Sequence, residues 1–112
     1  MIKIKYHYTD DFRLKGFTLK GHAEYAEYGY DIVCSAVTSN AIGVDNSLNL
    51  LAKVEFESEI GQEGMIEFIV KESCLNYKTD LLFEHFKLTM EGIKGQYPKN
   101  IKILRNEGAV SY

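Results

Sequence analysis

The segment DIVCSAVTSNAIGVDNSLNLLA, residues 31–52, decides the fold because its apolar residues have the spacing of a single α-helix. They recur every three or four positions, which places them in one stripe along the helix. The stripe consists of Val33, Val37, Ala41, Val44, Leu48 and Leu51. Asp31 is a suitable N-cap, which would make Cys34 the N3 residue. A glycine costs about 1 kcal/mol in a helix interior relative to alanine, so we expect close packing against Gly43.

The residues before this helix alternate between apolar and polar, as in strands with one buried face. The first predicted strand spans Ile2 to Tyr8. The second carries apolar residues on both sides of Gly16, namely Phe12, Leu14, Phe17 and Leu19. The parity of this pattern changes at Gly16, and a one-residue slip needs a β-bulge to keep the apolar side chains on one face. We therefore predict a bulge at Gly16.

The residues after the helix predict a hairpin, a second helix and a closing strand. The hairpin pairs Val54–Ile60 with Met65–Val70, the helix runs from about Asn76 to Lys94, and the last strand spans Lys99–Arg105. The predicted order is ββαββαβ in a single domain, residues 1–112. Such an order indicates an α+β fold in which a mainly antiparallel sheet packs against two helices. The pattern leaves the strand order open.

Composition and charge exclude several classes of function. The net charge of −3 argues against direct nucleic-acid binding and favours a basic partner. Glu55, Glu57 and Glu59 alternate along one predicted strand, where most such charge is solvated surface. We expect no membrane span and no leader, hence a cytoplasmic protein whose Cys34 and Cys74 are free thiols. No short-spaced pair of ligands suggests zinc, and we expect neither a metal nor a cofactor.

His22 and Cys34, twelve positions apart, pair a candidate base with a candidate nucleophile. The histidine follows a predicted strand and the cysteine opens a predicted helix, so the intervening loop can bring them together. A thiolate is favoured at a helix N-terminus, because unpaired N–H groups and the helix dipole point there. The amides of Cys34 and Ser35 are candidate donors to an oxyanion. These features indicate cysteine-nucleophile chemistry with His22 as general base and acid.

Several neighbouring residues have two interpretations. Asp31 either orients His22 as a third catalytic residue or caps the helix, and capping is the preferred interpretation. Thr38 lies one turn after Cys34 on the same face and either contacts substrate or steadies the thiol. A loop containing Tyr25 and Tyr28, together with Tyr30, forms either an aromatic lid that binds substrate or ordinary surface packing.

The motif Gly21-His22-Ala23, followed by GYDIVCSAVT at residues 29–38, closely resembles the signature of the Prp family of ribosomal-processing cysteine proteases. The likeness extends to chain length and element order and so covers essentially the whole chain. It implies that His22 and Cys34 form a catalytic dyad and that Asp31 belongs to the site. Family members commonly have serine at the position of Thr38, which keeps the hydroxyl.

The resemblance also implies a substrate and an assembly. Family members remove an N-terminal extension from a basic large-subunit ribosomal protein, and they are cytoplasmic, cofactor-free homodimers. The alternative hypothesis is a non-enzymatic, ribosome-associated protein-binding module in which His22 and Cys34 are packing residues.

Overall fold

The computed structural model describes residues 1–21, 30–61 and 64–104, with the backbone alone at residues 30 and 31. Within these ranges the predicted ββαββαβ order and α+β fold are confirmed. The strands are β1 (Ile2–Tyr8), β2 (Leu14–Lys20), β3 (Phe56–Ile60), β4 (Ile66–Val70) and β5 (Ile101–Leu104). The helices are α1 (Tyr30–Ser47) and α2 (Tyr77–Gln96), with short helical turns η1 (Leu48–Ala52) and η2 (Glu72–Cys74).

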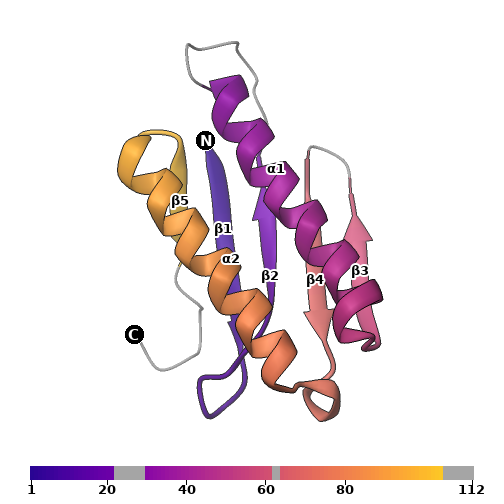
Figure 1. The fold of residues 1–112 in the computed structure, drawn as a ribbon. Helices are drawn as coiled ribbons and strands as arrows, with labels where there is room; N and C mark the ends of the chain where they lie inside the picture. Colours follow the sequence, from indigo (N-terminus) through magenta and orange to yellow (C-terminus); the bar gives the residue numbers. More distant parts are fainter. Residues whose placement is uncertain (22–29, 62–63, 105–112) are drawn as a thin grey trace.

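The strands form one sheet in the order β3-β4-β2-β1-β5. β1 with β2, β2 with β4, and β3 with β4 are antiparallel, whereas β5 runs parallel to β1. Both long helices cover the same face of the sheet (Figure 1). None of the helices in the described ranges has the length and apolar character needed to cross a bilayer.

The predicted bulge lies on β2. His7 pairs with Gly16 and Tyr8 pairs with Leu14, so Lys15 is the extra residue. A Cβ added to Gly16 would lie 2.1 Å from the carbonyl oxygen of Phe68 on β4. Glycine is therefore needed for the close approach of the two strands. The strand itself begins at Leu14, two residues later than predicted.

The core lies between the sheet and the two helices, as the alternating strands and the helical stripe predicted. Phe17 is its centre, with its ring stacked on Phe86 at a centroid distance of 4.0 Å. The rings of Phe68 and Phe83 meet Phe17 edge-on at 5.5 and 6.3 Å. All four phenylalanines are at most 2% exposed. Stacked and edge-on aromatic pairs add to the stability that comes from burial.

Helix α1 differs from the prediction at both ends. It begins at Tyr30, so Asp31 lies inside the first turn instead of at the N-cap. After Ser47 the chain continues as a π-helical turn, and the N–H of Lys53 donates to the carbonyl of Leu48. The wider turn shifts the buried position by one residue. Leu51 is therefore 64% exposed, while Ala52 is buried.

Helix α2 begins at a capping box, close to its predicted start. The side chain of Asn76 accepts from the N–H groups of Lys78 and Thr79, and the Thr79 hydroxyl accepts from the N–H of Asn76. Asp80 in the first turn accepts two hydrogen bonds from Arg13, at 2.7 and 3.0 Å. This ion pair ties the helix to the end of the β1–β2 connection.

The close packing expected at Gly43 is wrong, and this leads to a prediction for two glycines. Among the described residues, a Cβ added at Gly43 meets no atom within 4 Å. We expect Gly43→Ala to raise the free energy of unfolding by about 0.5–1 kcal/mol, because alanine loses less backbone entropy in a helix. Gly16→Ala should lower it by about 2–3 kcal/mol through overpacking against Phe68.

Urea unfolding of the two variants beside the wild type measures both effects. A stabilising Gly16→Ala substitution would contradict the bulge geometry. A destabilising Gly43→Ala substitution would show that this helix position is not open.

Candidate active site

Cys34 lies near the start of α1 and is a free, half-buried thiol. It is the fifth residue of the helix, because α1 begins at Tyr30, and so lies two residues beyond the predicted N3 position. Its side chain packs against the edge of the hydrophobic core. The N–H groups that lack an intrahelical acceptor extend only as far as N3, which here is Ile32. The predicted oxyanion donors, the amides of Cys34 and Ser35, instead lie within the hydrogen-bonded helix.

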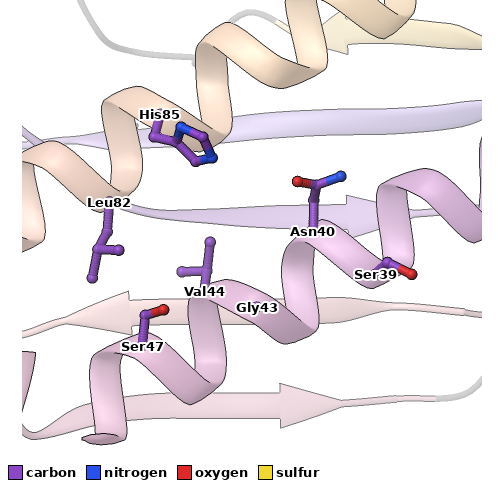
Figure 2. Close-up of a pocket in the computed structure, with 7 residues that line it drawn as sticks. All are labelled: Ser39, Asn40, Gly43, Val44, Ser47, Leu82 and His85. Atoms are coloured by element: carbon purple, nitrogen blue, oxygen red, sulfur yellow. The ribbon is translucent and has the colours of Figure 1, made fainter. Parts of the chain in front are cut away.

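The opposite side of α1 faces α2 across a shallow hollow. Asn40, Gly43 and Ser47 line it from α1, and Leu82 and His85 line it from α2 (Figure 2). Its volume is about 330 Å³. The amide nitrogen of Asn40 donates to the carbonyl of Ala36 at 2.8 Å, so this donor is already used within the helix. Of the predicted site residues whose side chains the structure describes, none lines this hollow.

Cys34 therefore faces away from α2. The buried stripe of α1 contains Val33, Val37 and Ala41, and the hollow lies on one side of that stripe. At 100° per residue, Cys34 and Thr38 fall on the other side, and both are half-buried. α2 packs against β2 and β5, so the free flank of α1 is turned toward β4 and β3. We refer to the side of α1 that carries Cys34 and Thr38 as the thiol flank.

His22, Tyr25 and Tyr28 lie outside the described residues. For Tyr30 and Asp31 the structure gives the backbone, which forms the first turn of α1. β2 ends at Lys20 and α1 starts at the same end of the sheet (Figure 1). The described chain on either side of His22 therefore reaches the end of the molecule where Cys34 lies.

Cys74 occupies the other end of the sheet. It ends η2, which follows β4, and β4 is antiparallel to β2. Cys74 is free, as predicted, and half-buried against the core. The two cysteines thus differ in place but share partial burial, which makes Cys74 a matched control for Cys34. In the described ranges, no three His, Cys, Asp or Glu side chains gather in a way that would hold a metal.

The structure also shows a polar network that sequence reasoning missed. On the open face of the sheet, Nε2 of His7 donates to the hydroxyl of Thr18 at 2.7 Å, and that hydroxyl donates to Glu67 at 2.6 Å. The three residues come from adjacent strands β1, β2 and β4. Only the strand order, which the sequence left open, brings them together.

The His7 network predicts a loss of stability in mild acid. Desolvation lowers the pKa of His7, although the nearby Glu67 carboxylate acts in the opposite direction. The unfolded chain, with a histidine pKa of about 6.5, then binds more protons than the folded chain just below that pH. The free energy of unfolding should fall as pH drops below about 6.5, and His7→Gln should reduce this slope. Urea unfolding at several pH values measures it, with His85→Gln as the control. An unchanged slope in His7→Gln would contradict the prediction.

Comparisons with known proteins place the chain among proteases. The family model described as "Cysteine protease Prp" matches residues 1–102. The chain is 30% identical to the ribosomal processing cysteine protease Prp of Bacillus subtilis over 110 residues, covering 95% of this chain and 98% of that protein. The corresponding protein of Staphylococcus aureus is 23% identical over 103 residues, covering 92% of this chain and 97% of that protein.

Solved structures share the fold. The ribosomal processing protease Prp from S. aureus in complex with a substrate peptide superposes with a TM-score of 0.84 at 22% identity, covering 93% of this chain and 98% of that one. SMU.848 from Streptococcus mutans superposes with a TM-score of 0.77 at 28% identity, covering 92% and 91%.

Proposed function

The chain belongs to the Prp family of cysteine proteases, and we propose that it removes the N-terminal extension of a basic large-subunit ribosomal protein, with Cys34 as nucleophile and His22 as general base and acid. The observation that carries this proposal is the position of Cys34. It is a free thiol in the second turn of α1, at the end of the sheet where β2 leads into His22.

The proposed reaction proceeds through a thioester. His22 takes the proton from the thiol as Sγ of Cys34 attacks the carbonyl carbon of the scissile peptide bond. The C–N bond then breaks, and His22 gives its proton to the leaving amine. Water, deprotonated by His22, hydrolyses the thioester and releases the N-terminal fragment. The positive end of the α1 dipole favours the thiolate throughout.

The other predicted site residues have supporting roles in this proposal. Thr38 lies one turn from Cys34 on the thiol flank, where its hydroxyl would contact substrate. Tyr25, Tyr28 and Tyr30 would form an aromatic lid over the bound peptide. Asp31, inside the first turn of α1 instead of at its N-cap, would be available to orient His22.

We further propose a cytoplasmic homodimer. The support for self-association is a row of exposed apolar side chains on α2, where Tyr77, Leu81 and Leu88 are 70–75% exposed. Large apolar side chains gathered on a surface are typical of interaction sites. Sedimentation equilibrium should give twice the chain mass, and a monomer at all concentrations would contradict the proposal.

Incubation of the purified chain with the extended ribosomal protein tests the proposed function. Mass spectrometry should show loss of the N-terminal extension at one bond. A ribosomal protein lacking the extension serves as the control and should stay intact. Full-length substrate after prolonged incubation with active-site-titrated protein would overturn the proposed substrate.

A further inference from the structure

One row of apolar residues on the helix-covered face of the sheet is buried at one end and open at the other. Ile4 pairs with Leu19, Leu19 with Ile66, and Ile66 with Ile60, so the row crosses β1, β2, β4 and β3. Ile4 and Leu19 are 0% and 3% exposed, Ile66 is half-buried, and Ile60 is 76% exposed. The helices therefore cover the row over β1 and β2 but leave it open over β3.

The open part of the row lies beside the thiol flank. α1 starts at the end of the sheet near the close of β2 and runs obliquely toward the far end of β3 (Figure 1). Ile60 and Ile66 are at the end of the sheet where α1 starts, because they share a row with Leu19 near the end of β2. The thiol flank is turned toward these strands, as shown above. We call Ser58, Ile60 and Ile66 the hairpin shelf.

β3 also offers an unpaired backbone edge. It is the terminal strand of the sheet and pairs only with β4 among the described strands. The N–H of Gly61 donates to the carbonyl of Met65, so hydrogen-bonded pairs alternate from there along the hairpin. By this alternation, the N–H and C=O groups of Ser58 and Ile60 point away from β4. The residues with free backbone groups are thus the same residues whose side chains lie on the shelf.

The other face of β3 is acidic. Glu57 and Glu59 point to the open face of the sheet, and Glu59 is directly opposite Glu67. Like charges directly opposite each other are destabilising. Within the described part of the chain, neither Glu57 nor Glu59 forms an ion pair. A cation placed next to this strand would relieve the repulsion.

We infer that β3 is the docking strand for the peptide substrate, which adds to the sheet as an extended strand of alternating apolar and basic residues. Its backbone pairs with the free groups of Ser58 and Ile60. Its apolar side chains pack on the hairpin shelf beside the thiol flank, and its basic side chains meet Glu57 and Glu59. The period of two follows from strand geometry, since successive side chains point to opposite faces. This inference deepens the proposed peptidase function and rests on it.

Peptide binding to the inactive Cys34→Ala variant tests the docking strand without requiring cleavage. The probe is a fluorescein-labelled peptide of about eight residues in which Leu and Lys alternate, measured by fluorescence anisotropy. Its controls are a peptide of the same composition with Leu and Lys in separate blocks, and one in which Glu replaces Lys. We expect the alternating Leu–Lys peptide to bind at least about tenfold more tightly than either control.

Protein variants locate the binding. Ile60→Ser should weaken binding of the alternating peptide at least about tenfold, because the apolar surface that the leucines of the peptide bury against Ile60 is lost. Joint replacement Glu57→Lys and Glu59→Lys should reverse the preference between the Leu–Lys and Leu–Glu peptides. Leu50→Ser is the matched control, since Leu50 is 70% exposed on η1, and it should bind as tightly as the parent. In an added strand, only every second residue of the peptide points its N–H group toward β3. N-methylation of the peptide should therefore weaken binding at these residues and leave it unchanged at the residues between them.

Failure of the docking strand and failure of the proposed peptidase reaction give different results. Equal binding of the three peptides, or equal binding by Ile60→Ser and Leu50→Ser, would overturn the docking strand even if the wild type cleaves its ribosomal substrate. Selective binding by β3 together with no cleavage by the wild type would support the docking strand and overturn the proposed reaction.

Discussion

Cys34→Ser should lower kcat/KM for the extended ribosomal protein by at least about 10⁴-fold, with little change in stability. The substitution exchanges one atom at a half-buried position and leaves the helix and core contacts in place. What it removes is the nucleophile, since a hydroxyl is not converted to an anion by the dipole of α1 and one imidazole as readily as a thiol. Steady-state cleavage by mass spectrometry and urea unfolding give the two quantities.

Cys74→Ser is the control for this prediction. It replaces the other half-buried thiol, at the opposite end of the sheet. Its cleavage rate should stay within about twofold of the wild type, because no step of the proposed reaction uses it. If cleavage survives in Cys34→Ser but is lost in Cys74→Ser, then Cys74 and not Cys34 is the nucleophile, and the prediction is wrong.

His22→Gln should lower kcat/KM by about 10³-fold, because general acid–base catalysis commonly contributes 10²–10⁴-fold. The leaving amine needs a proton, and glutamine cannot supply one. The same variant should slow the alkylation of Cys34 by iodoacetamide at neutral pH, since a neighbouring imidazolium favours the thiolate. Peptide mapping of the alkylated protein measures this second effect.

His85→Gln separates the loss of a catalytic imidazole from the loss of any histidine. His85 is exposed and lines the hollow on the other side of α1. It should neither change cleavage nor slow the alkylation of Cys34. If His22→Gln cleaves as fast as His85→Gln, then another group carries the proton.

The sequence predicted the elements of the fold well because each has a strong local signal. β1 has the exact bounds of its alternating pattern, and the parity change at Gly16 locates the bulge to within one residue. Asn76 and Thr79 give α2 a capping box that fixes its start. These features depend on residues close together in the chain, so one sequence is enough to see them.

The sequence did not predict the features that depend on contacts between distant segments or on small changes of helix geometry. The prediction that Leu51 is buried assumed 3.6 residues per turn throughout the helix. The turn after Ser47 is a wider π turn, and Leu51 is therefore exposed. Close packing was expected against Gly43, but the hollow between α1 and α2 leaves open space beside this residue. The strand order comes from pairing between segments far apart in sequence, so the His7 network and the exposed edge of β3 had no local signal.

The predicted helix position of Cys34 was only approximately right. Cys34 does lie near the start of a helix, but two residues beyond N3, because α1 begins at Tyr30. Helix boundaries are weakly encoded, since several residues before the apolar stripe are compatible with a first turn. Cys34 is turned toward β4 and β3 because α2 packs on the other side of α1, and only the tertiary structure shows where α2 packs.

The most direct measurement is the mass of the reaction intermediate. The wild-type protein is mixed with the extended ribosomal protein, quenched in acid within the first turnover, and analysed by intact and peptide mass spectrometry. Thioester linkage predicts that the protein gains the mass of the N-terminal fragment less one water, and that this addition is located on the peptide that contains Cys34. Product formed in the first turnover with the adduct on Cys74, or with no covalent adduct at any time, would contradict nucleophilic attack by Cys34.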